Sequence, residues 1–150
     1  VGTAQLSEQV DEEEEQPPQT HVLGQLVIAL CGAVLIAANV APTEEIVEIA
    51  AEVGAWRLLG IVFVSLLLGM MILFFSNFTQ SKRLAAVETT GEAIGGGIIT
   101  YIVALAASAA SLWFFGRFDT AGFDMIVGQT VVLSLPATLG ASAGRLLLQT

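Results

Sequence analysis

Histidine and cysteine are scarce in this sequence, and each scarcity excludes a kind of chemistry. The single histidine, His21, cannot supply a pair of axial haem ligands or an H-E-x-x-H metal site. The single cysteine, Cys31, excludes an internal disulfide. The chain also has no Walker loop, no G-x-S-x-G motif and no cysteine–histidine dyad. We therefore expect a protein that is not an enzyme and that binds no cofactor.

Basic charge is also scarce. The 150 residues include 5 lysines and arginines against 14 acids, which gives a net charge of -9. An acidic surface with so little lysine argues against nucleic acid and anionic lipid headgroups as main partners. Residues 1–20 are rich in Glu, Gln and Pro. They predict an acidic disordered tail or linker, because such residues bury too little apolar surface to offset the entropy of ordering. The start at Val1 rather than Met leaves open that the sequence is part of a longer protein.

Apolar residues dominate the remainder. Hydrophobic side chains make up 55% of the chain, charged ones 13%, and the mean hydropathy is +0.79. A helix needs about 20 apolar residues to cross roughly 30 Å of hydrocarbon. Four segments meet this requirement: residues 22–40, 56–75, 94–115 and 123–148. The sequence therefore predicts an all-α membrane protein with four transmembrane helices in a domain spanning residues 21–150.

A shorter amphipathic helix is predicted over residues 43–54, between the first two spans. Thr43 can cap its first turn, where the helix dipole favours carboxylates such as Glu44 and Glu45. Apolar and acidic side chains occupy opposite faces at helical spacing. The apolar stripe is Ile46, Ile49, Ala50 and Val53, and the acidic face is Glu44, Glu48 and Glu52. This pattern is typical of a helix lying at the membrane interface.

The acidic face has three interpretations. It is the solvated side of the interfacial helix, a site for a cation or proton, or a face on which another protein docks. In the second case Glu44, Glu45, Glu48 and Glu52 are the ligand candidates, with Asn39 adding a further oxygen, although the metal is not specified. Arg57 is a candidate counter-charge that folds back onto Glu52 or Glu48.

A second acidic pair, Glu88 and Glu92, lies one helical turn apart before the third span. Counting back about 20 residues from Phe115 places this pair at the membrane interface. Two roles are open: pairing with Lys82 and Arg83, or a vestibule or gating site. The Lys82–Arg83 pair also indicates that its loop is cytoplasmic. With four spans, both termini are then expected in the cytoplasm, as for a multi-pass protein of a bacterial inner membrane or an equivalent one.

Small residues favour close helix packing in the last two spans. Gly91 and Gly95 form a G-x-x-x-G motif, and Gly140 and Gly144 form another. These faces predict packing against other membrane helices, including a second copy of the chain. Neutral polar residues lie between the two acidic groups and either bond their own helix or line a path. They are Thr100, Ser108, Ser111, Gln129, Thr130, Ser134, Thr138 and Ser142.

Two segments carry a resemblance to a known family. NVAPTEEI (Asn39 to Ile46) and LPATLGASAGRLLL (Leu135 to Leu148) resemble DUF2391, an uncharacterised bacterial family of integral membrane proteins. The resemblance covers Val22 to Thr150 and leaves the acidic tail outside. It implies that the chain is the C-terminal half of a longer membrane protein. It implies no activity, cofactor or catalytic residue.

Two functions follow from these features. The first is a component of a cation or proton channel or transporter, with acidic sites at both membrane faces. The second is a non-conducting structural subunit that packs in a larger membrane complex. In both cases the protein is expected to be embedded in a lipid bilayer. A bound cation is expected only in the first case.

Overall fold

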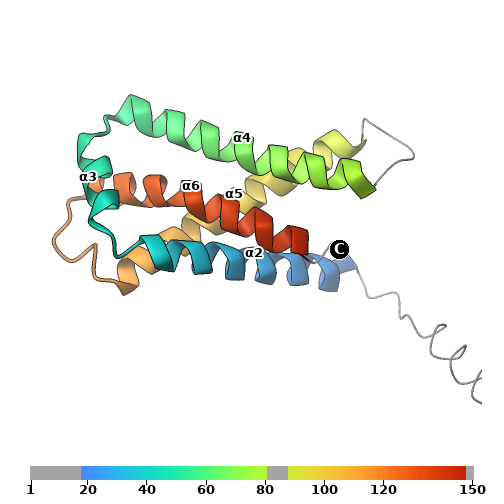
Figure 1. The fold of residues 1–150 in the computed structure, drawn as a ribbon, viewed down its shortest axis with the longest axis horizontal. Coiled ribbons are helices and arrows are strands. Elements are labelled where there is room, and N and C mark those ends of the chain that lie inside the picture. The colour runs from blue at the N-terminus through green and yellow to red at the C-terminus, as the bar shows by residue number, and fades with distance from the viewer. Residues whose placement is uncertain (1–17, 81–87, 148–150) are drawn as a thin grey trace, which may run out of the picture.

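The computed structural model describes residues 18–80 and 88–147, and all regular structure within them is helical (Figure 1). The helices are α2 (Pro18–Val40), α3 (Glu44–Glu52), α4 (Ala55–Gln80), α5 (Glu88–Phe114) and α6 (Phe123–Leu147). Four of them contain stretches long and apolar enough to span a membrane: Val22–Val40, Ala55–Phe75, Ile94–Phe114 and Phe123–Leu147. The predicted fold class is therefore confirmed. Residues 1–17, most of the predicted acidic tail, lie outside the described part, whereas Pro18 already begins α2.

Helix α6 is the centre of the bundle. It packs against α2, α3, α4 and α5, while α2 and α4 flank it on opposite sides (Figure 1). Because four long helices alternate in direction, Pro18 and Leu147 lie at the same end of the bundle. The opposite end, which we call the acidic end, contains α3 and the connection between α5 and α6.

The interior consists mainly of small side chains. Ala29, Ala33 and Ala37 recur every four residues along α2 and join one core cluster with Ala137 and Ala141 of α6. Large apolar side chains instead cover the outside, as the exposed Leu30, Phe63, Ile102 and Leu139 illustrate. A soluble monomer rarely exposes so much contiguous apolar surface, whereas a bilayer requires it.

Helices α2 and α6 approach each other closely enough for their backbones to touch. A Cβ added at Gly32 would overlap the carbonyl of Gly140, and one at Gly144 would lie 2.7 Å from the carbonyl oxygen of Ile28. Only glycine permits this approach. The motif of Gly140 and Gly144 therefore lies at a helix contact within the chain. In the part of the chain that is described, no atom comes within 4 Å of an added Cβ at Gly91 or Gly95, so that motif makes no such internal contact.

The close contacts of α5 lie at the next two glycines. An added Cβ at Gly97 would lie 2.6 Å from Cγ of Met70 on α4. At Gly96 it would lie 3.6 Å from Nη1 of Arg145. The two predicted packing residues, Gly91 and Gly95, precede these glycines in the same run, and their packing against helices outside this chain stays a prediction.

Candidate functional site

Helix α3 is held on the bundle by two side chains. Ile46 and Ala50 are buried, and Cβ of Ala50 would lie 3.3 Å from a Cβ placed at Gly128 of α6. Within the predicted apolar stripe Ile49 is 43% exposed, so Ile46 and Ala50 make the buried part of the stripe. The expected Thr43 cap is corrected: its hydroxyl donates backward to the carbonyl of Val40 and makes no cap bond.

The acidic end carries a net negative charge. Glu44, Glu45, Glu48 and Glu52 are all exposed, and so are the two acids of the α5–α6 segment, Asp119 and Asp124. Arg57 and Arg117 are the basic residues between Asn39 and Gln129 within the described ranges. Six carboxylates against two guanidiniums leave this end with a formal charge of -4. Among the described residues, no group of three or more His, Cys, Asp or Glu side chains is arranged to hold a metal ion.

The ion pair at this end differs from the predicted one. Nη1 of Arg117 lies 3.5 Å from Oε1 of Glu44, and Nη2 of Arg117 donates to the carbonyl of Pro42. Arg57 forms no ion pair with Glu48 or Glu52 within residues 18–80 and 88–147. Asn39 uses its amide nitrogen to donate to the carbonyl of Leu35, one turn back in α2. The side chains of Glu88 and Glu92 lie outside the described part, so their role stays a prediction.

A glycine turn positions Arg117. Gly116 has a φ of 69°, and its N–H donates to the carbonyl of Trp113, while the N–H of Arg117 donates to that of Leu112. This paired arrangement closes α5 in a Schellman motif, which requires the left-handed conformation that glycine adopts readily. The turn directs the chain back across the end of the bundle towards α3.

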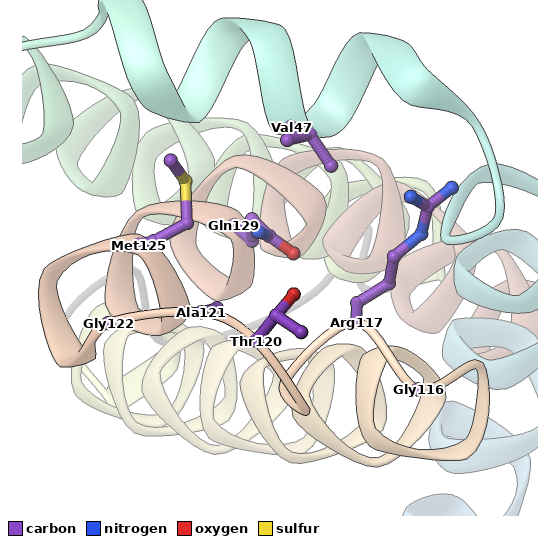
Figure 2. Close-up of a pocket in the computed structure, with 8 residues that line it drawn as sticks. All are labelled: Val47, Gly116, Arg117, Thr120, Ala121, Gly122, Met125 and Gln129. Carbon is purple, nitrogen blue, oxygen red and sulfur yellow. The ribbon is translucent and has the colours of Figure 1, made fainter.

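A pocket of about 330 Å³ lies between this turn, α3 and the start of α6 (Figure 2). Its lining combines polar and apolar groups from three separate segments. The lining residues are Val47, Gly116, Arg117, Thr120, Ala121, Gly122, Met125 and Gln129. Figure 2 shows the amide oxygen of Gln129 and the hydroxyl of Thr120 pointing into the same space, with Val47 on the far side. The guanidinium of Arg117 points away from that space.

Gln129 is the buried polar group of the pocket. Its side chain is 2% exposed, and Oε1 has no hydrogen-bond partner in the structure. A buried carbonyl oxygen without a partner costs free energy, on the order of 1–3 kcal/mol. Such a group in the wall of a pocket lacks the hydrogen-bond partner that buried acceptors normally have.

Beyond Gln129, α6 carries further buried polar side chains towards the other end of the bundle. Ser134, Thr138 and Ser142 are buried at four-residue spacing, and we call them with Gln129 the polar file. Ser134 and Thr138 donate to carbonyls of their own helix, and Ser134 also shares a 3.3 Å hydrogen bond with the hydroxyl of Tyr101 on α5. Oγ of Ser142 is buried without a partner in the structure.

The other predicted neutral groups are mostly used within their own helices. Thr100, Ser108 and Thr130 donate to the carbonyl four residues earlier. Ser111 is buried on α5. The structure therefore brings most of the predicted polar residues into the interior, and their hydroxyls are largely satisfied by helical backbone.

Arg145 closes the file at the end opposite the acidic one. Its Nη1 donates to the carbonyl of Gly96 at 3.1 Å and to Oγ1 of Thr100 at 2.7 Å, and its Nη2 donates to Oε1 of Gln25 at 3.1 Å. One guanidinium thus joins α2, α5 and α6. A guanidinium has five N–H donors in a fixed plane, which suits this three-helix contact.

Sequence reasoning missed three of these residues. No partner was predicted for Arg145, although an arginine within a predicted span usually faces the bundle interior and is paired there. Gly32 is one of two glycines in α2, and it does not form a G-x-x-x-G motif with the other, Gly24. The partners of Arg117, Glu44 and Pro42, lie 73 and 75 residues earlier in the sequence.

The fold and its apolar outer surface define a multi-pass, all-α integral membrane protein with four candidate spans. Residues 1–148 match the family described as "Putative integral membrane protein (DUF2391)". The chain belongs to that family. The match includes the acidic tail, which the resemblance in the sequence had left outside. No curated protein and no solved structure matches the chain.

Proposed function

We propose that the protein is a component of a cation or proton channel or transporter, and that cations enter at the acidic end. The observation that supports this most is the position of the Gln129 pocket. It lies at the end of the bundle that carries six exposed carboxylates, and Gln129 in its lining is the first residue of the polar file in α6.

The charge at the acidic end favours cations over anions. A surface with a net charge of -4 raises the local concentration of cations and their rate of arrival. The exposed Glu45, Glu48 and Glu52 act in this proposal as a collecting surface, while Glu44 neutralises Arg117. Asn39 contributes little, because its amide is engaged by its own helix.

The polar file is the proposed route. Burying a polar side chain inside the membrane costs free energy, and such residues often mark the pathway of a substrate or an ion. Gln129 and Ser142 each carry a buried oxygen without a partner, and Ser134 and Thr138 lie between them. The positive charge of Arg145 repels cations at the far end, so passage requires its guanidinium to move from Gly96 and Thr100. Glu88 and Glu92 remain candidates for an inner site.

The test is cation and proton flux through liposomes containing the purified protein. We expect flux from the natural sequence, a strong loss in the Gln129→Leu variant, and a reduced rate when Glu45, Glu48 and Glu52 are all changed to glutamine. Thr130→Val is the matched control, since Thr130 neighbours Gln129 but bonds the carbonyl of Ile126. Absence of flux, or flux that none of these changes alters, would rule out the proposal.

The alternative function is a non-conducting structural subunit. The observation that favours it is the backbone contact between α2 and α6 at Gly32 and Gly140, together with hydroxyls satisfied within their own helices. A folded protein that conducts nothing and purifies with other membrane helices, or as a complex of its own copies, would support this alternative.

The proposal also includes an orientation, with both termini in the cytoplasm of a bacterial inner membrane. In a Cys31→Ala background, cysteines introduced at Thr120 and at Thr20, before the first span, are expected on opposite sides of the bilayer. An impermeant thiol reagent added outside intact cells should therefore label only the Thr120→Cys variant, and labelling of only the Thr20→Cys variant would reverse the orientation.

A further inference from the structure

We infer that the Gln129 pocket binds a small organic ammonium ion, such as a primary alkylamine in its charged form. This deepens the proposed function, because it rests on the same acidic end and names the class of cation. Three observations support it: the pocket itself, the buried Oε1 of Gln129, which has no partner and points into the pocket, and the net negative charge of the acidic end.

The size and lining of the pocket do not suit a bare metal ion. Ca²⁺ takes about 6–8 oxygen ligands at roughly 2.3–2.6 Å, and several of these are usually carboxylates. The pocket has no carboxylate in its lining, and its volume is about 330 Å³. At about 30 Å³ of liquid for each water, that space holds several water molecules or one small organic molecule.

The polar side of the pocket offers acceptors for N–H groups. Oε1 of Gln129 has no partner, and the hydroxyl of Thr120 points into the same space (Figure 2). An ammonium group has three N–H donors and no acceptor, as a lysine side chain does. It can therefore satisfy Gln129 and Thr120 together, and a third donor remains for water.

The apolar side of the pocket accommodates a short alkyl chain. Val47 of α3, Ala121 of the connection and the thioether of Met125 on α6 line this side. Methionine adapts to ligands of different shape, because its side chain is flexible and polarisable. A hydrated inorganic cation would leave these three side chains facing water, whereas an alkylammonium ion covers them.

The positive charge of Arg117 does not reverse the preference of the pocket for a cation over an anion. Arg117 lines the pocket, but its Nη1 pairs with Glu44 and its Nη2 donates to the carbonyl of Pro42, and neither partner belongs to the lining. The five remaining carboxylates of the acidic end against Arg57 keep the local potential negative. An anion of similar size is therefore disfavoured.

The experiment is isothermal titration calorimetry on the full chain in detergent, at constant ionic strength, with two probes of similar shape and opposite charge. Ethylammonium is the expected ligand and acetate is its control. We expect ethylammonium to bind more tightly than acetate, sodium or calcium. Tighter binding of acetate or of either metal ion, or no measurable binding of ethylammonium, would overturn the inference.

Two variants locate the site. Gln129→Leu removes the acceptor and should weaken ethylammonium binding about tenfold or more, since hydrogen bonds to charged groups are the stronger ones. Val47→Phe fills the pocket from α3 while leaving Gln129 itself unchanged, and it should weaken ethylammonium binding as well. Thr130→Val should leave the affinity unchanged. Unchanged binding in Val47→Phe, or in a folded Gln129→Leu variant, would exclude this pocket.

Calorimetry measures binding and the liposome assay measures flux, so the inference and the proposed function can fail independently. Ethylammonium binding without flux would uphold the site and reject transport. Flux of inorganic cations without ethylammonium binding would uphold transport and reject this assignment of the ligand.

Discussion

Replacement of Gly32 by alanine tests the contact between α2 and α6. A Cβ at this position would overlap the carbonyl of Gly140, and its distance to the carbonyl carbon would be 2.9 Å. The obstacle is backbone of the central helix, which cannot rotate away as a side chain can. Overpacking of a close contact costs typically about 1–3 kcal/mol. Gly32→Ala should therefore destabilise the bundle.

A control on the same helix isolates the steric cost. Gly24 also lies in α2, but nothing comes within 4 Å of an added Cβ there. Both changes gain the same helix propensity, roughly 1 kcal/mol for alanine over glycine. The difference between the two variants is then the overlap itself, about 1–3 kcal/mol, or roughly 5–150-fold in the unfolding equilibrium.

The assay is reversible unfolding in mixed micelles of a mild detergent and dodecyl sulphate, followed by circular dichroism. We expect Gly32→Ala to unfold at a lower dodecyl sulphate fraction than the natural sequence, and Gly24→Ala at an equal or higher one. Equal midpoints for the two variants would refute the backbone contact. Gly140→Ala should resemble Gly32→Ala, because its Cβ would overlap the backbone carbonyl of Gly32.

Three further changes have expected outcomes in the same unfolding assay. Arg145→Ala should cost about 2–4 kcal/mol of stability by leaving buried acceptors unpaired, and Arg145→Lys should be intermediate. The exposed Arg57→Ala is the control and should change stability by no more than about 0.5 kcal/mol. A cost for Arg145→Ala no larger than that of the control would refute the three-helix contact. Arg117→Ala should cost only about 0–1 kcal/mol, because the carboxylate it pairs with is 81% exposed, and a loss above 2 kcal/mol would contradict this. Tyr101→Phe should cost about 0.5–1.5 kcal/mol through the lost bond to Ser134, and no change would indicate that this bond contributes nothing.

The transmembrane helices were predictable because hydropathy alone determines them. The four spans in the structure differ by at most one residue at either end from the predicted ones. Helix α3 was also predictable, since Pro42 and the spacing of Ile46 and Ala50 are local signals. Which residues of the stripe face α6 was not predictable, because the burial of Ile46 and Ala50 and the exposure of Ile49 depend on how α3 packs against α6.

The pocket could not be predicted from sequence patterns. Val47, Arg117 and Gln129 come from three segments, and their proximity depends on how α3 and the α5–α6 connection fold over α6. The glycine contacts show the same limit. Motif spacing identifies a helix face made of small residues. The packing of the bundle then determines that α6 contacts α2 at Gly32, whereas no atom of the described residues lies within 4 Å of a Cβ added at Gly91.

The central claim is that the acidic end concentrates cations at the Gln129 pocket. The most direct measurement is the reaction rate of a Thr120→Cys variant, in a Cys31→Ala background, with a cationic and an anionic thiosulphonate reagent. We predict that the cationic reagent reacts about tenfold faster, relative to a free thiol, and that high salt removes the difference. Equal rates, or a faster anionic reagent, would contradict the account.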